Sequence, residues 1–342
     1  MAPRRFDPKA LVILSLVSIL SCSLVPDPRP AHRLVLAEWN VENLFDEVHD
    51  GGEYAEFDPE KGWTRAQFWH RCEGLARVIR TLGDRGPDIL VLEEVEGAHA
   101  LQVLNERFLG DLDYRYTFLA SPSVPGIKTV FLSRFPLVRT GLLFPASAAD
   151  EVSRPIVEAE FSLGTRELVV LANHWKSRIP SPKATEPARS EAARTLSRRL
   201  VDLDAREDHP FVVAVGDFNT SLELSRPWPE RALVSGGVAA ASEAALVVFP
   251  GRTAAARSSR PGAVWDPWET VSTPAGSYYY QGDWDRLDHT FVAVSSLKAS
   301  DWGFESFRVA DYAARPQAYG VQNPNGISDH FPLVLTLARK GT

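Results

Sequence analysis

The sequence contains very little cysteine. Among its 342 residues there are two, Cys22 and Cys72. A disulfide between them would have to tie the extreme amino terminus to the rest of the chain, and we discount it, which excludes a disulfide framework as the basis of the fold. Cys72 falls in an amphipathic helical pattern, where a buried cysteine behaves as a small hydrophobic residue. Stability must therefore come from a hydrophobic core.

An excess of positive charge is also absent. The chain has 37 Lys and Arg against 44 Asp and Glu, which gives a formal net charge of −7 and a pI near 5.7. Proteins that bind nucleic acid non-specifically through bulk charge usually have a basic domain, so the composition argues against this class. An enzyme that neutralises phosphate locally with a metal ion remains compatible with it.

The apolar run near the amino terminus, residues 10–20, is too short for a transmembrane helix. It follows a basic start and ends at Ile-Leu-Ser-Cys, residues 19–22, so it indicates an export signal. Ile-Leu-Ser-Cys resembles a bacterial lipoprotein cleavage box, which predicts lipidation at Cys22. The alternative is a plain secretory signal that is cleaved near Ser21 or Ser23.

The remaining chain is expected to form one domain. Residues 23–31 contain three prolines and indicate a stiff tether. The length allows one large domain or two small ones, but no internal repeat or long linker interrupts residues 32–340. We expect an exported, monomeric bacterial protein with residues 1–22 as its signal peptide. It is either anchored to the membrane through Cys22 or free in the periplasm or medium.

The stretch from 211 to 221, FVVAVGDFNTS, gives the strongest local signal. Five apolar residues run without alternation, as in a strand buried on both faces, and stop at Gly216. Asp217 and Asn219 follow, and their oxygens suit Mg²⁺, with Mn²⁺ or Ca²⁺ as alternatives, better than zinc. The other interpretation is an ordinary turn, since Gly, Asp and Asn are common turn residues.

Similar patterns predict elements along the whole chain. A helix is expected from Thr64, a candidate N-cap, to Gly83, and a shorter one over 98–109. Residues 46–63 are acidic and indicate a surface loop, and residues 222–275 are the least readable part. Strands are predicted within 33–40, 87–96, 114–120, 127–137, 154–163, 167–178, 277–294 and 327–338.

A third helix is predicted over residues 185–204, with alanine and leucine residues on its inner face. We interpret its arginines as a solvated face, with a phosphate-binding patch as the alternative. They are Arg189, Arg194, Arg198 and Arg199.

Polar side chains lie where several predicted strands end or begin. Clefts in α/β proteins form outside the carboxyl ends of strands, so we expect these side chains to gather in one cleft. They are Asn40, Glu94, His174, Asp217, Asn219, Asp288, Asp329 and His330.

The motifs that contain these residues resemble the endonuclease/exonuclease/phosphatase superfamily, which has the DNase I-like fold. They stand in the family's order and are WNVENLF, DILVLEEVE, LSRFP, NHWKSR, GDFN, RLDHTFV and SDHFP. The resemblance implies a four-layer α/β/β/α sandwich of two mixed β-sheets flanked by helices. It also implies Mg²⁺-dependent hydrolysis of a phosphate ester.

The resemblance assigns a role to each matching residue. Asn40 and Glu94 would hold the metal, supported by Asp329. Asp217 would position or deprotonate the attacking water, and Asn219 would orient phosphate or metal.

The remaining roles concern the substrate phosphate. His330, paired with Asp288, would act in acid/base catalysis or stabilise the transition state. His174 would donate to a phosphate oxygen, and Lys176 and Arg178 would add positive charge there.

Two residues depart from the family's pattern. Glu93 replaces the usual glutamine before the metal glutamate and adds negative charge, which would tighten metal binding or discourage a polyanionic substrate. His289 stands where an aromatic residue is common. Neither change removes a catalytic group.

We expect a metal-dependent phosphodiesterase, foremost a nuclease. A sphingomyelinase-like or inositol-phosphate phosphatase activity is the alternative, and a catalytically silent binding module is the third option. An aromatic cluster is either a lipid-facing edge or strand packing. Its members are Trp265, Trp268, Tyr278, Tyr279 and Tyr280.

Overall fold

The computed structural model describes most of the chain from residue 32 onward. The described residues are 32–120, 126–146, 154–164, 166–222, 232–236, 246–299, 301–320 and 323–340. Contacts group the chain from His32 onward into one unit. The predicted signal peptide, Cys22 and the tether at 23–31 lie outside the described residues.

The first sheet has six strands in the order β15-β16-β1-β2-β4-β3. β1 runs parallel to β2 and antiparallel to β16. The bounds of these strands are β1 (Arg33–Leu44), β2 (Ile89–Val95), β3 (Tyr116–Leu119), β4 (Lys128–Ser133), β15 (Trp302–Val309) and β16 (Leu333–Arg339).

The second sheet has eight strands in the order β5-β6-β7-β8-β14-β11-β10-β9. They are β5 (Leu137–Leu143), β6 (Ile156–Ser162), β7 (Glu167–His174), β8 (Phe211–Asp217), β9 (Leu233–Ser235), β10 (Leu246–Phe249), β11 (Val264–Trp265) and β14 (Asp288–Ala293). A separate hairpin joins β12 (Tyr278–Tyr280) to β13 (Asp283–Asp285).

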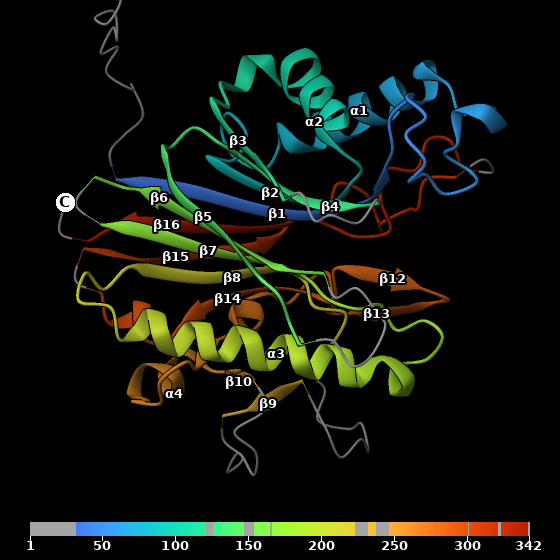
Figure 1. Ribbon diagram of the computed structural model, residues 1–342. Coiled ribbons are helices and arrows are strands. Elements are labelled where there is room, and N and C mark those ends of the chain that lie inside the picture. The colour runs from blue at the N-terminus through green and yellow to red at the C-terminus, as the bar shows by residue number, and fades with distance from the viewer. Residues whose placement is uncertain are drawn as a thin grey trace, which may run out of the picture. The chain divides into compact units, whose positions relative to one another are not determined.

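Helices cover the outer faces of both sheets (Figure 1). The helices are α1 (Arg65–Ile79), α2 (Ala98–Gln102), a π-helix (Val103–Phe108), α3 (Pro182–Asp204) and α4 (Arg252–Arg257). Short 3-10 turns lie at Pro59–Lys61, Gly110–Leu112, Pro267–Thr270 and Ser296–Lys298. Thr64 begins α1 with a capping box to Gln67, as expected from its position.

Three hydrophobic clusters separate the layers. The central one contains Leu36 and Val213, which come from different sheets, so it fills the space between them. A second cluster packs Phe68 of α1 against the first sheet, and a third packs Leu196 of α3 against the second sheet. The alternation of side chains along β1 and β8 supplies both faces of each sheet. The predicted four-layer sandwich is therefore confirmed.

Strand direction brings the polar strand ends to one edge. β1 and β2 are parallel, as are β7 and β8, so the carboxyl ends of each pair lie together. β14 and β16 run antiparallel to β8 and β1, so their amino ends reach the same edge. This explains why residues that precede β16 lie beside residues that follow β1.

The predicted solvated face of the third helix is wrong for Arg189. This side chain is 1% exposed. Its guanidinium donates to the carbonyl oxygens of Lys176 at 3.2 Å and Pro182 at 2.7 Å, and to Glu186 Oε2 at 2.7 Å. It is buried because these acceptors, around the loop that precedes α3, need donors.

Other expectations differ in detail. The patterns did not predict β15 or the short elements β9, β10, β11 and α4 within 222–275. Trp265 and Trp268 are buried in the core, at 0% and 2% exposure, so the packing interpretation is correct for them; Tyr280 is 59% exposed. Within the described part of the chain, no helix is both long and apolar enough to span a bilayer.

Candidate active site

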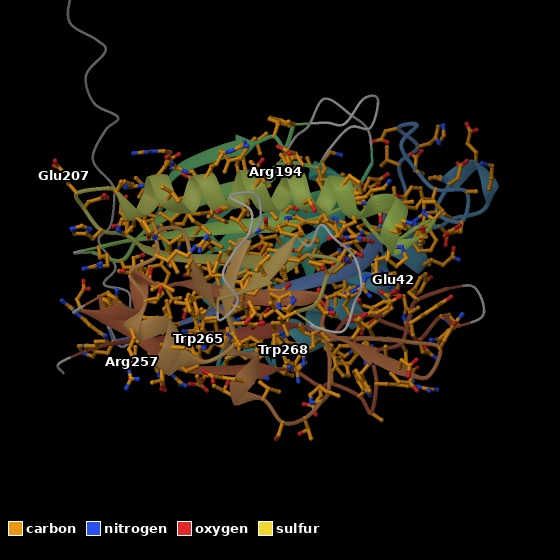
Figure 2. The ribbon with its side chains drawn as sticks, turned by 90° about the horizontal axis from the view of Figure 1, so that it is seen from below. Glu42, Arg194, Glu207, Arg257, Trp265 and Trp268 are labelled. Atoms are coloured by element: carbon orange, nitrogen blue, oxygen red, sulfur yellow. The ribbon has the colours of Figure 1, made fainter. Side chains whose placement is uncertain are left out.

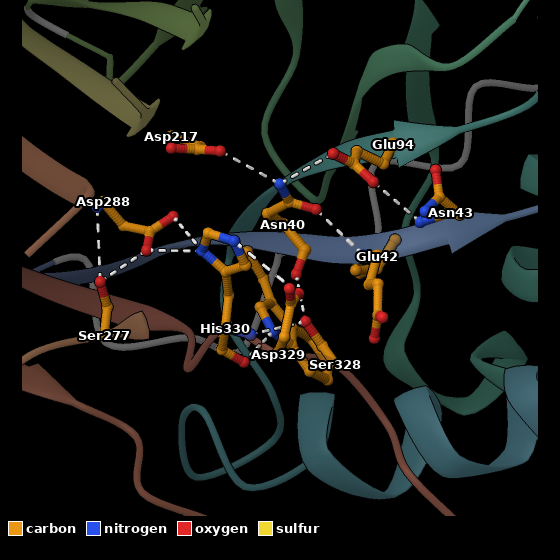
Figure 3. A network of polar contacts seen from close by, with 12 residues as sticks. Asn40, Glu42, Asn43, Glu94, Asp217, Ser277, Asp288, Ser328, Asp329 and His330 are labelled. Atoms are coloured by element: carbon orange, nitrogen blue, oxygen red, sulfur yellow. Dashed lines mark hydrogen bonds and ion pairs between the residues drawn. The ribbon is translucent and has the colours of Figure 1, made fainter. Parts of the chain in front are cut away.

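Strand register places the predicted site residues opposite one another. In the second sheet, Asp217 pairs with His174 on one side and with Asp288 on the other. In the first sheet, Asn40 pairs with Glu93, the residue before Glu94. Figure 3 shows Asn40, Glu94, Asp217, Asp288 and His330 grouped at this edge.

Three predicted metal ligands are in contact. The Asn40 amide Nδ2 lies 3.1 Å from Glu94 Oε1 and 3.3 Å from Asp217 Oδ2. Asn40 and Asp217 are 2% exposed, so the group is held in a largely dry environment. The contacts bridge the two sheets, which makes this group the junction between them.

The backbone is bent to present these ligands. The φ angles of Glu42, Asn43, Glu94 and Asn219 lie between 50° and 66°, a region that non-glycine residues rarely adopt. The β1–β2 register shifts at the same place. Such conformations concentrate at functional sites because the surrounding structure must hold them.

Gly216 is required by close packing beside Asp217. Its φ is +123°. A Cβ there would lie 2.0 Å from the Asn173 carbonyl oxygen and 2.9 Å from Glu93 Oε1. The glycine therefore lets the end of β8 approach both β7 and β2.

His330 and Asp288 form a buried pair, as predicted from the sequence. His330 Nδ1 lies 2.8 Å from Asp288 Oδ2 and 3.1 Å from Oδ1, and Asp288 is 1% exposed. Burial opposes protonation of the imidazole, but the charges of Asp288 and Asp329 outweigh it and raise the pKa of His330 well above its usual value. The imidazolium form is therefore favoured.

Further contacts fix this pair in place. Ser277 Oγ donates to Asp288 Oδ2 at 2.5 Å, and Trp268 Nε1 donates to the Asp288 carbonyl oxygen at 3.0 Å. Trp39 Nε1 donates to the His330 carbonyl oxygen at 3.0 Å. Ser277 was not predicted from the sequence, because a single serine before an aromatic run carries no distinctive signal.

Asp329 lies on the other side of His330. Its Oδ1 is 3.8 Å from His330 Nε2. Burial raises the pKa of Asp329, His330 lowers it, and Glu94 raises it. The neighbouring Ser328 Oγ donates to the Asn40 carbonyl oxygen at 2.7 Å and thus ties this loop to β1.

Asn219 lies beside Asp217. Its backbone N–H donates to Asp217 Oδ1 at 2.8 Å and its Nδ2 donates to Asp217 Oδ2 at 2.7 Å. Arg178 Nε donates to the Asn219 carbonyl oxygen at 3.0 Å, and its Nη1 pairs with Asp285. These contacts give Arg178 a role in holding the loop, in addition to any charge it supplies to a phosphate.

His174 has a cationic neighbour that the sequence did not predict. Arg154 Nη1 lies 2.5 Å from His174 Nε2. Burial, and then the charge of Arg154, lowers the pKa of His174. The same Nε2 lies 3.3 Å from Glu94 Oε1, and this contact acts in the opposite direction and raises the pKa of His174. Lys176, two residues on, is half-buried.

Two further glutamates lie beneath the site. Glu38 and Glu93 are 1% and 0% exposed, and none of their carboxylate oxygens has a hydrogen-bond partner among the described residues. Burial, followed by the charges of Asp288 and other nearby carboxylates, raises the pKa of both well above the usual value. The raised pKa disfavours the negative charge that we expected Glu93 to add.

The donors at the ligand group fit a hard divalent cation. The carboxylate oxygens of Glu94 and Asp217 are donors that such ions prefer. Asn40 directs its Nδ2 toward them, and its Oδ1 accepts the Glu42 backbone N–H at 3.0 Å. Burial opposes ionisation of Glu94, but contacts with His174, the charge of Arg154 and the Asn40 amide lower its pKa to about 2. An ionised Glu94 is the form that binds a metal. Asp217, Asp288 and His330 form a second convergent set, with ligand atoms within 4.8 Å of one another.

Several solved structures share this fold. A humanized TDP2 of D. rerio is 17% identical, with a TM-score of 0.56, covering 89% of this chain and 98% of that one. The human Nocturnin catalytic domain with a bound sulfate is 17% identical, with a TM-score of 0.53, covering 90% and 94%. An endonuclease/exonuclease/phosphatase family protein from Bacteroides thetaiotaomicron is 16% identical, with a TM-score of 0.53, covering 90% of this chain and 97% of that one. At these identities the likeness shows the fold.

Sequence comparison identifies the family. Curated proteins give no match. A sequence model of the Endonuclease/Exonuclease/phosphatase family matches residues 35–225, which include Asn40, Glu94, His174, Asp217 and Asn219. Because this match spans more than half of the chain, the protein belongs to the endonuclease/exonuclease/phosphatase family of phosphate-ester hydrolases.

Proposed function

We propose that this protein is an exported, Mg²⁺-dependent phosphodiesterase that acts on nucleic acid. The observation that carries the proposal is the position of the Asp288–His330 pair beside the group formed by Asn40, Glu94 and Asp217. An acid/base pair beside a hard-cation site is what hydrolysis of a phosphodiester requires.

A Mg²⁺ ion held by Asn40 and Glu94, with Asn219 and Asp329 nearby, would stabilise negative charge on the phosphate and acidify a water molecule. Mn²⁺ and Ca²⁺ suit the same donors. Asp217 would position or deprotonate the attacking water. His330 would donate a proton from Nε2 to the leaving oxygen, with Asp288 holding its Nδ1–H.

The positive groups near the site suit a phosphate. Arg154 lies at His174, and Lys176 follows it on the same segment. A bidentate guanidinium is well matched to phosphate oxygens. Because the whole chain carries a net charge of −7, affinity for a polyanion must come from this local charge and the metal.

A nucleic acid is the favoured substrate class. A TDP2 of D. rerio with the same fold, at 16% identity, was solved in complex with a single-strand DNA product. Sphingomyelin and inositol phosphates are the alternatives. The exposed Tyr280 lies in the hairpin whose Tyr278 ring is 4.8 Å from His330, so an apolar substrate would meet this edge first.

Export through a lipoprotein signal, with a lipid anchor at Cys22, is part of the proposal. Its support is the apolar run that ends at Ile-Leu-Ser-Cys.

The test is a substrate panel with purified mature protein. Duplex DNA, single-stranded DNA, RNA, a synthetic phosphodiester, sphingomyelin and inositol phosphates are each incubated with Mg²⁺ and with EDTA. We expect Mg²⁺-dependent cleavage of a nucleic acid, loss of that activity in His330→Ala, and full activity in Glu207→Gln. Glu207 is exposed and lies at the opposite end of the domain from Glu42 (Figure 2). Preference for sphingomyelin or an inositol phosphate would contradict the substrate class.

A further inference from the structure

A second acidic cluster lies in the loop that follows β1. Between residues 46 and 58 this loop has six carboxylates and no lysine or arginine. It forms no regular helix or strand before the 3-10 turn at Pro59–Lys61. Mutual repulsion should open such a loop unless an attractive interaction holds it.

Three carboxylates of this region converge. One oxygen each from Asp50, Glu53 and Glu96 lies within 4.8 Å of the others. The Glu53 side chain is 2% exposed and Glu96 is 3% exposed, whereas Asp50 is exposed to solvent. The cluster therefore has a buried floor and an open entrance.

Glu96 supplies an oxygen that the protein does not satisfy. Its Oε2 accepts from the Asp46 backbone N–H at 2.7 Å. Its Oε1 is buried and has no hydrogen-bond partner among the described residues. Both oxygens of Glu53, in contrast, accept backbone N–H groups, from Asp50 at 2.5 Å and from Gly51 at 3.0 Å. An unpaired buried carboxylate oxygen is costly, so it calls for a ligand.

Two nearby basic side chains contact other oxygens than Glu96 Oε1. Lys128 Nζ donates to the Glu96 carbonyl oxygen at 2.5 Å and to the Gly126 carbonyl oxygen at 2.7 Å. His49 Nδ1 lies 3.4 Å from Glu53 Oε2. Among the described residues, neither of these groups donates a hydrogen bond to Glu96 Oε1.

We propose that Asp50, Glu53 and Glu96 bind a Ca²⁺ ion at a site separate from the catalytic metal. The three donors are carboxylate oxygens, which favour a hard cation over zinc. Calcium accepts six to eight oxygens in a flexible arrangement, with carbonyl groups and waters completing the shell, whereas Mg²⁺ demands near-octahedral geometry. An irregular loop with two adjacent glycines at 51 and 52 suits the former.

The bound ion would fix the segment that supports Glu94. The Asn43 backbone N–H donates to Glu94 Oε2 at 3.0 Å, and the Asp46 N–H donates to Glu96. Both ends of this short segment are therefore tied to the end of β2. The proposal does not rest on the proposed function, since it concerns binding of an ion at a different place.

The test uses the full mature chain, freed of metal with EDTA and placed in excess Mg²⁺ to fill the catalytic site. Titration with CaCl₂ by calorimetry, and equilibrium dialysis with labelled calcium, should show one bound Ca²⁺ per chain. Glu96→Gln and Asp50→Asn should each lower the Ca²⁺ affinity at least roughly tenfold, because mutation of residues around a metal typically lowers its affinity by that factor or more. Ca²⁺ should also raise the Tm of the wild type in the same buffer.

Two control variants separate this site from others. Glu60→Gln removes one charge from an exposed position in the 3-10 turn that follows this loop and should bind Ca²⁺ as the wild type does. Glu94→Gln removes a catalytic ligand and should keep Ca²⁺ binding. The proposal is overturned if the folded wild type binds no Ca²⁺ in excess Mg²⁺, if Glu96→Gln and Asp50→Asn bind it unchanged, or if Glu94→Gln abolishes binding.

Discussion

Replacement of Asp288 by asparagine is expected to lower turnover without unfolding the protein. Asparagine keeps the size of the side chain and one oxygen that can accept the His330 Nδ1 proton. It removes the negative charge that lies 2.8 Å from that nitrogen. The pKa of His330 should then fall, because Asp288 is the strongest of the charges that raise it.

The magnitude follows from the hydrogen bond that changes. A charge-assisted hydrogen bond contributes about 1.5–3 kcal/mol, and each 1.36 kcal/mol in a barrier corresponds to roughly a factor of ten. Asp288→Asn should therefore lower kcat by about tenfold to a hundredfold. His330→Ala removes the acid itself and should cost about 10²–10⁴-fold. The double variant should be little slower than His330→Ala, because coupled catalytic groups do not contribute additively.

The pH profile gives an independent reading of the same pair. The raised pKa keeps His330 protonated at neutral pH, so turnover that needs the imidazolium should fall only as the pH rises through that pKa. In Asp288→Asn the pKa is lower, and the alkaline fall should move to lower pH. The assay is initial-rate hydrolysis of a synthetic phosphodiester over a range of pH, with Asp283→Asn, an exposed position, as matched control. Wild-type turnover in folded Asp288→Asn, or multiplicative losses in the double variant, would refute the pairing.

Three further changes test other parts of the structure. Arg189→Ala leaves several buried acceptors unpaired and should lower the free energy of unfolding by about 3 kcal/mol in chemical denaturation. The control Arg198→Ala, at an exposed position, should change it by less than about 0.5 kcal/mol. Equal effects of the two substitutions would contradict the buried role of Arg189. Glu93 has a raised pKa in the fold, so its cost to stability appears as the pH rises above the ordinary value of about 4.3. Glu93→Gln should therefore raise the Tm at about pH 8 and leave it unchanged at about pH 4, and a lower Tm at both would exclude a neutral Glu93. Cys22→Ser should move the protein from the membrane fraction to the soluble one, since a lipoprotein anchor carries several acyl chains; an unlipidated mature terminus beyond residue 22, seen by mass spectrometry, would rule this out.

The fold and most of the site could be predicted because the strands and the polar residues that follow them are both visible in the sequence pattern. Continuous apolar runs identified β2 and β8, and polar residues at the carboxyl ends of such strands lie where clefts form in α/β proteins. Asp217 and Glu94 were accessible in this way. His330 and Asp288 depended on the family resemblance, since nothing local reveals that residues 42 positions apart share a hydrogen bond.

The features of the site and of the third helix that the sequence did not predict depend on tertiary contacts. Arg154 precedes β6 as a single charge, and only the pairing of β6 with β7 brings it to His174. Arg189 lies in an amphipathic helix whose polar face was interpreted as solvated, but it donates to the carbonyl groups of Lys176 in the preceding loop and of Pro182 at the start of α3. The raised pKa of Glu93 arises from burial between the sheets, which a sequence pattern does not report.

The central claim is that Glu94 holds a metal ion that hydrolysis requires. The most direct measurement is the initial rate of phosphodiester hydrolysis by wild type and Glu94→Ala, each with Mg²⁺ and with EDTA, after circular dichroism has shown equal folding. We predict no turnover in EDTA and restoration of wild-type turnover by Mg²⁺. Glu94→Ala should lower turnover by roughly a hundredfold or more, since mutation of residues that only hydrogen-bond to a metal ligand already lowers metal affinity or activity by about tenfold to a hundredfold. Full activity of the wild type in EDTA, or of the folded Glu94→Ala variant, would contradict the account.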